Sequence, residues 1–508
     1  MNPLDYSKQI NLWLTSDSTE YQKLVDKLRV AIEAELKANH GLTRFKKAEH
    51  EKPLFHILAD LFITYKADPN RYLAYSRDKG QFSSVKILTR YNPKRFALKP
   101  FTNVVNALSS LDYIVDFDGI HYSNYSRTAR MIATGKLSAL FDTHGLTVTN
   151  FYQLDTKESI ILKTPKDEHN NTSKIDYEDT AETIEMRKSL KLINDNIGKH
   201  WIDLKVTDEQ FSELQEKLYI RATSGNQNDK HKSPVDFTRT NQVRIFNNGD
   251  VDNPQFNQGG RFYGGWWLSI PSAYRSRIRI NGKKTVELDY SAMHFYMMYA
   301  EKGLAIPDGD PYTLDGIDRK KAKLALNTAL NASNKSKALS AIKRNQWPDE
   351  TIEEVTTILD KLLAKHKAIS EYFYTGKGLE FQCKDSQVAE LVMLNMWNKH
   401  GVIVLPVHDS FIVSAASYDN LKAEMLISFD EITGYTAKMK STVPDETLKS
   451  DMDKLAQQVE YDASRTLTKV GVNAANTFDA YKQEQGAYIG YRLRGEHVEL
   501  TKHKRNAN

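Results

Sequence analysis

Two aspartates occupy positions from which they could bind metal ions. Asp289 ends a strand-like segment, and Asp409 lies at a turn between two apolar segments that read as strands. A carboxylate at a strand end or in a hairpin turn can project beyond a sheet, and carboxylate oxygens are ligands that Mg²⁺ prefers. Two such groups sharing two ions suit phosphoryl or nucleotidyl transfer, in which the metals activate the attacking oxygen and stabilise the leaving one. Taken singly, each aspartate is more often a turn or cap residue.

A pair of cations lies between these aspartates in the sequence. Arg319 and Lys323 are four residues apart, so on a helix they share one face. Two positive charges on one face can hold a triphosphate, and the lysine can stabilise or protonate a departing pyrophosphate. The simpler interpretation of RKKAK in isolation is a solvated basic face. The flanking aspartates are what favour phosphate binding.

Several short motifs follow one another in a recognisable order. Along the chain they are GGRFYGGWWLSIP (259–271), LDYSAMH (288–294), DPYT (310–313), the pair Arg319 and Lys323, and VHDSF (407–411). In this order they resemble the right-hand polymerases, the superfamily of family A DNA polymerases and phage-type single-subunit RNA polymerases. The resemblance covers residues 240–440 and sets Arg261 on the arginine that precedes the palm.

The resemblance implies an α+β fold, in which helices cover the antiparallel palm sheet of a right hand. The expected domains are a mainly helical, thumb-like, template-binding region (1–235), a palm with short fingers (236–440) and a C-terminal helical extension with a basic tail (441–508). A bacterial or phage-infected cell, or a mobile element, is the setting implied by resemblance.

The same resemblance assigns roles to individual residues. Asp289 and Asp409 are expected to bind two Mg²⁺ ions, or Mn²⁺ instead, with the Tyr290 backbone carbonyl completing the shell. Lys323 is expected to be catalytic, and Arg261 and His408 to contact template–primer DNA or the growing strand. The nucleoside triphosphate is expected to contact Arg319, Lys323, Tyr290, His294, Asn327 and Asn331.

The sequence departs from the family at positions that govern sugar choice. His294 stands five residues after Asp289, where the DNA polymerases have a glutamate that blocks a 2′-hydroxyl. Asn331 stands where the RNA polymerases have a tyrosine that recognises this hydroxyl. A bulky group in the blocking position favours deoxyribonucleotides. The VHDSF motif has the form found in the RNA polymerases and so favours ribonucleotides. The alternative is that His294 is buried and does not meet the sugar.

A second basic cluster lies in the N-terminal region. Lys86, Arg90, Lys94 and Arg95 are interleaved with Tyr91 and Phe96. Cations for phosphates beside rings for stacking suit a nucleic-acid groove, although a solvated basic surface explains them equally well.

Hydrophobic periodicity predicts the elements that carry these residues. Helices are expected at 22–37, 125–141, 351–363 and 386–399, and strands at 243–246, 277–280 and 285–288. Thr351 and Glu354 form a capping-box pattern. The polar segments 165–180 and 223–234 read as loops, the second marking a domain boundary.

Composition excludes some classes of protein. Cys383 is the single cysteine, so neither an internal disulfide nor a cysteine-rich zinc site is expected. No apolar run reaches about 18 residues, which predicts a cytoplasmic protein without a membrane partner. The net charge of +5 is too small to indicate nucleic acid by itself.

Three functions remain open on this evidence. The preferred one is a DNA-directed DNA polymerase. The second is a DNA-directed RNA polymerase or primase of the phage type. The third belongs to another class: a non-catalytic DNA-binding or replication-initiation protein on a palm scaffold. Such a protein would have no need for paired aspartates together with Arg319 and Lys323.

Overall fold

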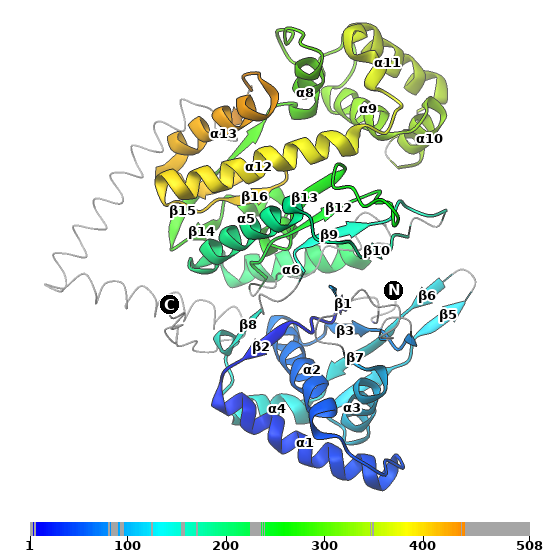
Figure 1. Ribbon diagram of the computed structural model, residues 1–508, viewed down its shortest axis with the longest axis vertical. Coiled ribbons are helices and arrows are strands. Elements are labelled where there is room, and N and C mark those ends of the chain that lie inside the picture. The colour runs from blue at the N-terminus through cyan, green and yellow to red at the C-terminus, as the bar shows by residue number, and fades with distance from the viewer. Residues whose placement is uncertain are drawn as a thin grey trace, which may run out of the picture.

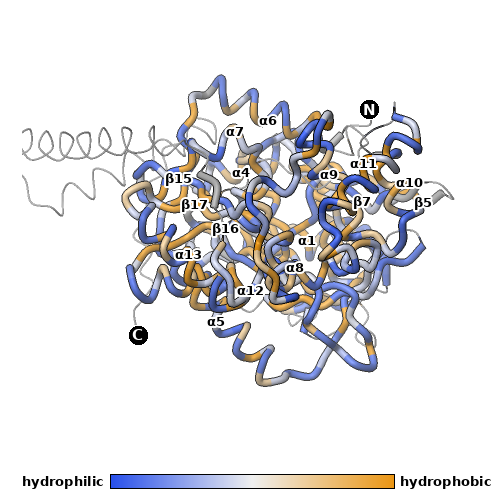
Figure 2. Tube along the Cα trace, turned by 90° about the horizontal axis from the view of Figure 1, so that it is seen from above, coloured by the Kyte–Doolittle hydropathy of each residue, from blue (hydrophilic) through white to orange (hydrophobic). Residues whose placement is uncertain are grey.

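The buried apolar residues of the computed structural model form two separate clusters, one within residues 14–151 and the other within 160–437. Figure 1 shows the corresponding two bodies, and in Figure 2 the outer parts of the trace are mostly hydrophilic. The described residues lie between 4 and 441, with gaps at 5–6, 80–81, 83–89, 92–95, 123–124, 154–157, 169–170, 224–234, 236, 238, 346, 348–349 and 438.

The boundary expected near residue 235 does not separate the two cores. Helices α5 (Ala181–Gly198) and α6 (Asp208–Thr223) bury Leu190 and Leu214 in the second cluster, with 0–1% of each residue exposed. The cores therefore divide between residues 151 and 160. The expected C-terminal extension, 441–508, lies almost wholly outside the described residues.

The N-terminal body packs a sheet, which was not predicted, against helices that contain more of its residues than the strands do. Its four-stranded sheet has the order β1-β3-β7-β4, and β2 pairs with β8. Its elements are β1 (Ser7–Gln9), β2 (Leu14–Ser16), α1 (Thr19–Asn39), α2 (Lys47–Ala67), β3 (Tyr72–Tyr75), α3 (Leu98–Ser110), β4 (Ile114–Phe117), β5 (Ile120–Tyr122), β6 (Tyr125–Arg127), β7 (Ala129–Ala133), α4 (Gly135–Thr143) and β8 (Phe151–Gln153).

One expected helix in this body, 125–141, is instead β6, β7 and the start of α4. Along β7, Ala129 and Met131 are buried while Arg130 is only partly so. That period of two belongs to a strand with one face on the core. The helix expected at 22–37 is confirmed as α1, whose buried residues include Leu24, Leu28 and Ile32.

The second body contains two sheets and most of the motifs. One sheet has the order β10-β9-β12-β13, and the other has six strands in the order β11-β14-β15-β17-β16, with β18 also paired to β15. The strands are β9 (Ile160–Lys163), β10 (Lys174–Ile175), β11 (Ile202–Leu204), β12 (Val243–Phe246), β13 (Gly259–Tyr263), β14 (Ile278–Ile280), β15 (Lys283–Tyr290), β16 (Leu405–Val407), β17 (Ser410–Ser414) and β18 (Met439–Ser441).

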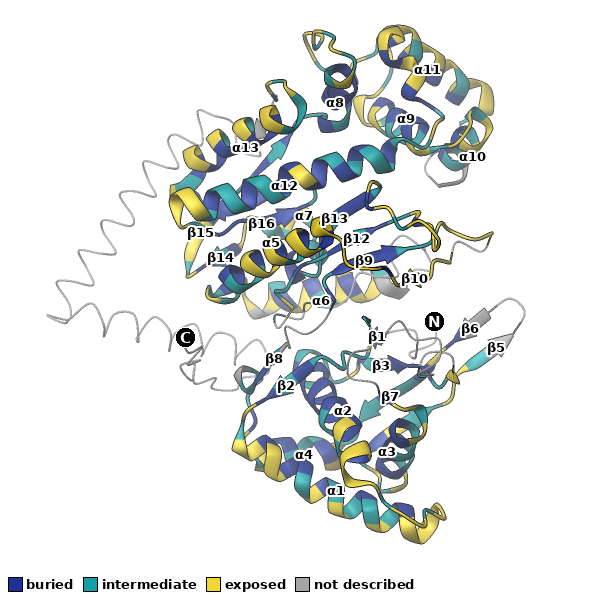
Figure 3. Cartoon of the chain, in the orientation of Figure 1, coloured by how far each residue is buried: buried dark blue, intermediate teal, exposed yellow. Residues whose placement is uncertain are grey.

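Helices cover these sheets, as expected for an α+β fold. The longest of them, α12, runs across the body, and Figure 3 shows that most of its length is buried or half-buried. In Figure 1, α9, α10 and α11 gather at one end of α12. Besides α5 and α6, the helices are α7 (Ser272–Arg275), α8 (Met293–Glu301), α9 (Arg319–Asn331), α10 (Lys335–Asn345), α11 (Ile352–Lys365), α12 (Gly378–His400) and α13 (Tyr418–Thr433).

The predicted elements of this region are confirmed with small shifts. The capping box of Thr351 and Glu354 opens α11. The strands expected at 243–246 and 285–288 are β12 and part of β15. The helix expected at 386–399 begins eight residues earlier, at Gly378. Among the described residues, no helix is long and apolar enough to span a bilayer.

Both neighbouring tryptophans are core residues. Trp266 and Trp267 are 2% and 0% exposed, and the Trp267 indole donates a hydrogen bond from Nε1 to the Pro406 carbonyl oxygen at 3.0 Å. Pro406 is the central residue of β16, which leads into the turn at Asp409. Trp267 therefore ties that turn to the core.

Replacing Trp267 with phenylalanine is expected to lower the free energy of unfolding by about 2–4 kcal/mol, because it leaves a small cavity and an unsatisfied carbonyl. Urea titration measures this change. Trp266→Phe is the matched control, since its buried Nε1 has no hydrogen-bond partner in the described part of the chain. Equal losses for the two variants would show that the Pro406 hydrogen bond contributes nothing.

Candidate functional site

Asp289 and Asp409 come together on neighbouring strands. Asp289 lies in β15 directly opposite Ser410 of β17, and Asp409 is the residue before Ser410. Asp409 and His408 form the two-residue turn between β16 and β17, with His408 in the left-handed region at φ 62°. The Tyr290 amide donates to the Asp409 carbonyl oxygen at 3.3 Å. Both aspartates are partly exposed, so a ligand can reach them.

The donor set suits a hard divalent cation. It consists of two carboxylates from adjacent strands and the backbone carbonyl of Tyr290, all oxygen ligands. In the described part of the chain, no group of three or more His, Cys, Asp or Glu is placed to hold a metal. Glu287, two residues before Asp289, instead accepts hydrogen bonds from Ser410 Oγ at 2.7 Å and Arg275 Nε at 2.8 Å.

A buried carboxylate that sequence reasoning missed lies beside this pair. Asp385 of α12 has a side chain that is 0% exposed. Both of its oxygens accept hydrogen bonds from Arg261 Nε at 3.0 Å, and Oδ2 also contacts Arg261 Nη2. His294 Nε2 lies 2.7 Å from the same Oδ2. Arg261 and His294, expected to contact nucleic acid and nucleotide respectively, thus share one anchor.

The charges of this group are well defined. Burial alone would raise the pKa of Asp385, but hydrogen bonds from His294 and Arg261, together with the charge of Arg261, hold that pKa below its usual value. Asp385 is therefore an anion at neutral pH and can only accept hydrogen bonds, so the proton between it and His294 belongs to Nε2. Burial lowers the pKa of Arg261, yet Asp385 and Asp409 reverse this and raise it overall.

His408 has unusual surroundings. Burial, and next the nearby charge of Arg261, lower its pKa, so its imidazole is neutral at pH 7. Its ring meets Tyr263 edge to face at 5.7 Å. Nδ1 is buried without a hydrogen-bond partner among the residues described. A left-handed backbone and an unpaired buried nitrogen each raise the free energy of the folded state. Such unfavourable features are found more often at functional sites than elsewhere.

Arg319 and Lys323 lie on the same face of α9, as expected, and both contact the aromatic ring of Tyr312. Arg319 Cζ lies 5.3 Å from the centroid of Tyr312, and Lys323 Nζ lies 5.8 Å from it. Both cations are exposed, and Arg319 also pairs with Asp310. Burial raises the pKa of Tyr312 well above its usual range, and Asp409 acts on Tyr312 in the same direction. The buried tyrosine thus contacts both cations and feels the charge of Asp409.

Three other residues predicted to contact the nucleotide, Asn327, Asn331 and Tyr290, each use one polar group in a hydrogen bond within the protein. The Asn331 amide donates from Nδ2 to Asn327 O at 2.8 Å, and it lies so close to Gly378 that a Cβ there would be 2.0 Å from Asn331 Oδ1. This contact joins α9 to the start of α12. The Tyr290 side chain is 2% exposed and donates from its hydroxyl to Met425 O at 2.5 Å, which leaves only its backbone for a ligand.

Of the four cations predicted to line a basic nucleic-acid groove, the structure describes Arg90. Arg90 is bound within the protein: it pairs with Glu158 at 2.9 Å, Asp179 at 2.8 Å and Asp176 at 3.3 Å, and its guanidinium lies 3.9 Å from the centroid of Tyr177. Its charge is paired with three carboxylates of the protein itself, and its role in binding nucleic acid stays a prediction. Lys86, Lys94 and Arg95 lie outside the described residues.

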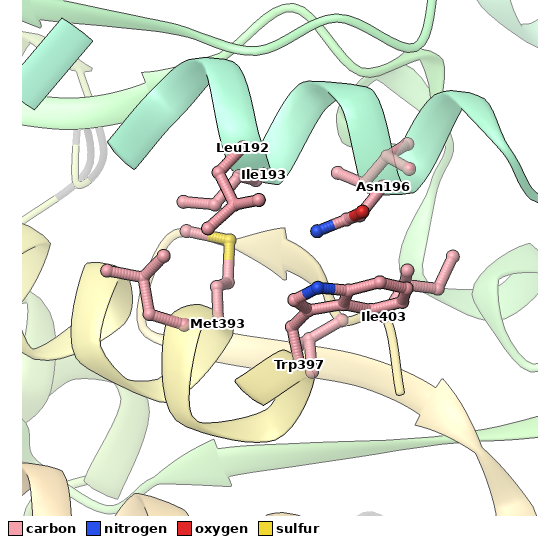
Figure 4. Close-up of a pocket in the computed structure, with 9 residues that line it drawn as sticks. Leu192, Ile193, Asn196, Met393, Trp397 and Ile403 are labelled. Atoms are coloured by element: carbon pink, nitrogen blue, oxygen red, sulfur yellow. The ribbon is translucent and has the colours of Figure 1, made fainter. Parts of the chain in front are cut away.

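Two hollows lie apart from the aspartates. Figure 4 shows one between α5 and α12, lined by apolar side chains such as Leu192, Met393 and Trp397. The other lies between the starts of α9 and α11 and has a mixed lining that includes Lys321, Glu350 and Glu353. Neither is lined by Asp289 or Asp409.

Comparisons with known proteins give little. No protein-family model and no curated protein sequence matches the chain. Among solved structures, one similar chain is the POL domain of Pol1 from M. smegmatis in complex with DNA primer-template and dNTP. The match has a TM-score of 0.28 and 11% sequence identity, and it covers 51% of this chain and 63% of that one. At this TM-score the two folds are not shown to be the same.

Proposed function

We propose that the chain is a template-directed nucleic-acid polymerase, with deoxyribonucleoside triphosphates as its preferred substrates. The observation that carries the proposal is the pairing of Asp289 with Asp409 on adjacent strands. Arg319 and Lys323 support it, because they flank Tyr312, which Asp409 influences electrostatically. Carboxylates for metals near exposed cations for phosphates form the set that nucleotidyl transfer requires.

In that reaction the 3′-hydroxyl oxygen of the growing strand attacks the α-phosphorus, and the bond to the bridging oxygen breaks to release pyrophosphate. Two divalent ions, when bound, would activate the attacking oxygen and stabilise the leaving one. Asp289, Asp409 and the Tyr290 carbonyl would hold them. Arg319 would bind the phosphates as a planar fork, and Lys323 would follow the charge that develops on the leaving pyrophosphate.

The surrounding elements would take the other roles. The six-stranded sheet would be the palm, and α9–α11 short fingers. The neutral His408 belongs to the turn that carries Asp409, and it would meet the end of the growing strand together with Arg261. The N-terminal body would bind the template.

A primer-extension panel tests the proposal. DNA and RNA templates are each offered ribo- and deoxyribonucleotides, with Mg²⁺, with Mn²⁺ and with chelator. We expect incorporation that needs a template and a divalent ion, with deoxyribonucleotides preferred. Preference for ribonucleotides would favour the RNA polymerase or primase alternative. Binding of DNA with no incorporation under any condition would leave only the non-catalytic alternative.

His294 gives a prediction on sugar choice. If its ring blocks the 2′-hydroxyl, His294→Ala should raise ribonucleotide incorporation relative to deoxyribonucleotide by roughly ten-fold, the effect of removing a clash of about 1.4 kcal/mol. Competition between the two triphosphates measures this ratio. His400→Ala is the control, because His400 is equally partly exposed but pairs with Glu424 at the far end of α12. An unchanged ratio in His294→Ala would show that this ring does not meet the sugar.

A further inference from the structure

Asp385 and Arg261 form an ion pair whose position needs an explanation. Asp385 has 0% of its side chain exposed, while Arg261 is 18% exposed. A buried ion pair is weak evidence for stability, because the loss of hydration offsets much of the attraction. The pair instead has a clear geometric effect: three contacts to Asp385 fix the guanidinium in one orientation.

That orientation matters because the turn that carries Asp409 packs against the strand of Arg261: the ring of His408, the residue before Asp409, lies 5.7 Å from that of Tyr263, two residues from Arg261 on β13. Asp409 is among the groups that raise the pKa of Arg261. The Asp409 carboxylate itself forms no ion pair or hydrogen bond that the structure records in the described part of the chain. An arginine without a partner would be drawn to Asp409, since a guanidinium and a carboxylate form strong bidentate pairs. A guanidinium there would occupy the oxygens that a divalent cation needs.

We propose that Asp385 is a positioning residue that holds Arg261 away from Asp409 and thereby keeps the Asp409 carboxylate open to a divalent cation. The proposal rests on the proposed function, in which Asp409 binds metal. His294 completes the arrangement by donating from Nε2 to Asp385 Oδ2 at 2.7 Å, so this oxygen is fixed from two sides. Arg261 remains beside the site, where it can meet the growing strand without displacing the metal.

Direct Mn²⁺ binding tests this without any turnover. Electron paramagnetic resonance titration gives the Mn²⁺ dissociation constant of the free protein. Asp385→Asn keeps the size of the side chain but removes its charge, so Arg261 should turn to Asp409 and weaken Mn²⁺ binding by roughly ten-fold or more. Adding Arg261→Gln to Asp385→Asn removes the competitor, and Mn²⁺ affinity should return to within about three-fold of the wild type.

The chain offers a matched control on the same helix. Glu390 of α12 pairs with the buried Arg244 at 2.5 Å, and neither residue is among the main groups that shift the pKa of Arg261. Glu390→Gln should therefore lower the melting temperature without changing the Mn²⁺ dissociation constant. If Asp385→Asn does not fold, Arg261→Gln alone carries the test, and it should bind Mn²⁺ at least as tightly as the wild type.

The possible results separate the two proposals. Wild-type Mn²⁺ affinity in Asp385→Asn, weak binding in the double variant, or weakened binding in Arg261→Gln would each overturn the role of Asp385. If instead Asp409→Asn bound Mn²⁺ as well as the wild type, the metal site of the proposed function would be wrong.

Discussion

Replacing Asp289 or Asp409 with asparagine is expected to reduce nucleotide incorporation by several orders of magnitude while leaving the fold intact. Asparagine keeps the size of the side chain but loses the charge that binds a hard divalent cation. Metal stabilisation is the main catalytic device in phosphoryl transfer, so little activity should remain. The backbone pairing of Asp289 with Ser410 does not depend on the carboxylate, which is why the melting temperature should change little.

Single-turnover incorporation on a primed template, together with thermal unfolding, measures both parts of this prediction. Asp360→Asn is a suitable control, because Asp360 is an exposed aspartate of α11 that pairs with Lys335 at 2.7 Å. Near-normal incorporation by either Asp289→Asn or Asp409→Asn would contradict the two-metal assignment. A large loss in the control as well would point to a general effect on the protein.

The place of each aspartate in its own element could be predicted because a strand end and a two-residue turn are local features, whereas their pairing across β15 and β17 was expected from the family resemblance alone. Alternating and continuous apolar segments predicted the strands, and a two-residue turn restricts the positions that the side chain of Asp409 can take. Arg319 and Lys323 were predictable for the same reason, since four residues make one helical turn. The structure adds Tyr312, which both cations contact and which comes from the DPYT segment nearby.

Asp385 could not be found in this way because its role depends on distant partners. The sequence predicted that this helix begins at Ser386, eight residues after its observed start at Gly378, so Asp385 fell just outside the predicted helix. In the observed helix α12, Asp385 shares the buried face with Phe381 and Val388, and a carboxylate on such a face requires a cationic partner. That partner, Arg261, is 124 residues away in the sequence.

Arg90 shows that the order of residues along the chain does not reveal the partners of a charge. A run of cations and rings resembles a nucleic-acid groove when its neighbours are counted along the chain only. In the fold, Glu158 and Asp179 lie against Arg90 and satisfy its charge. The sheet of the N-terminal body was missed for a related reason: its strands are three to five residues long and their pairing is not local.

Removing the cations of α9 should separate binding of the triphosphate from the chemical step. Arg319→Ala is expected to raise the apparent KM for the nucleotide by about ten-fold, since a charge-assisted hydrogen bond contributes about 1.5–3 kcal/mol and Arg319 must first leave Asp310. Lys323→Ala is expected to lower kcat by about a hundred-fold, because its charge acts most on the departing pyrophosphate. Template affinity should change little, as only one surface cation is lost in each variant.

Lys320 provides the control on the same helix. It is exposed like its neighbours, but one residue further along α9 it lies about 100° around the axis from Arg319, so Lys320→Ala should leave both constants unchanged. Pre-steady-state kinetics over a range of nucleotide concentrations, with template binding measured by fluorescence anisotropy, distinguishes the two effects. A large loss of template binding with unaltered nucleotide affinity would place this face of α9 on the template backbone. In that case the aspartate pair would have to work with phosphate ligands from elsewhere in the chain.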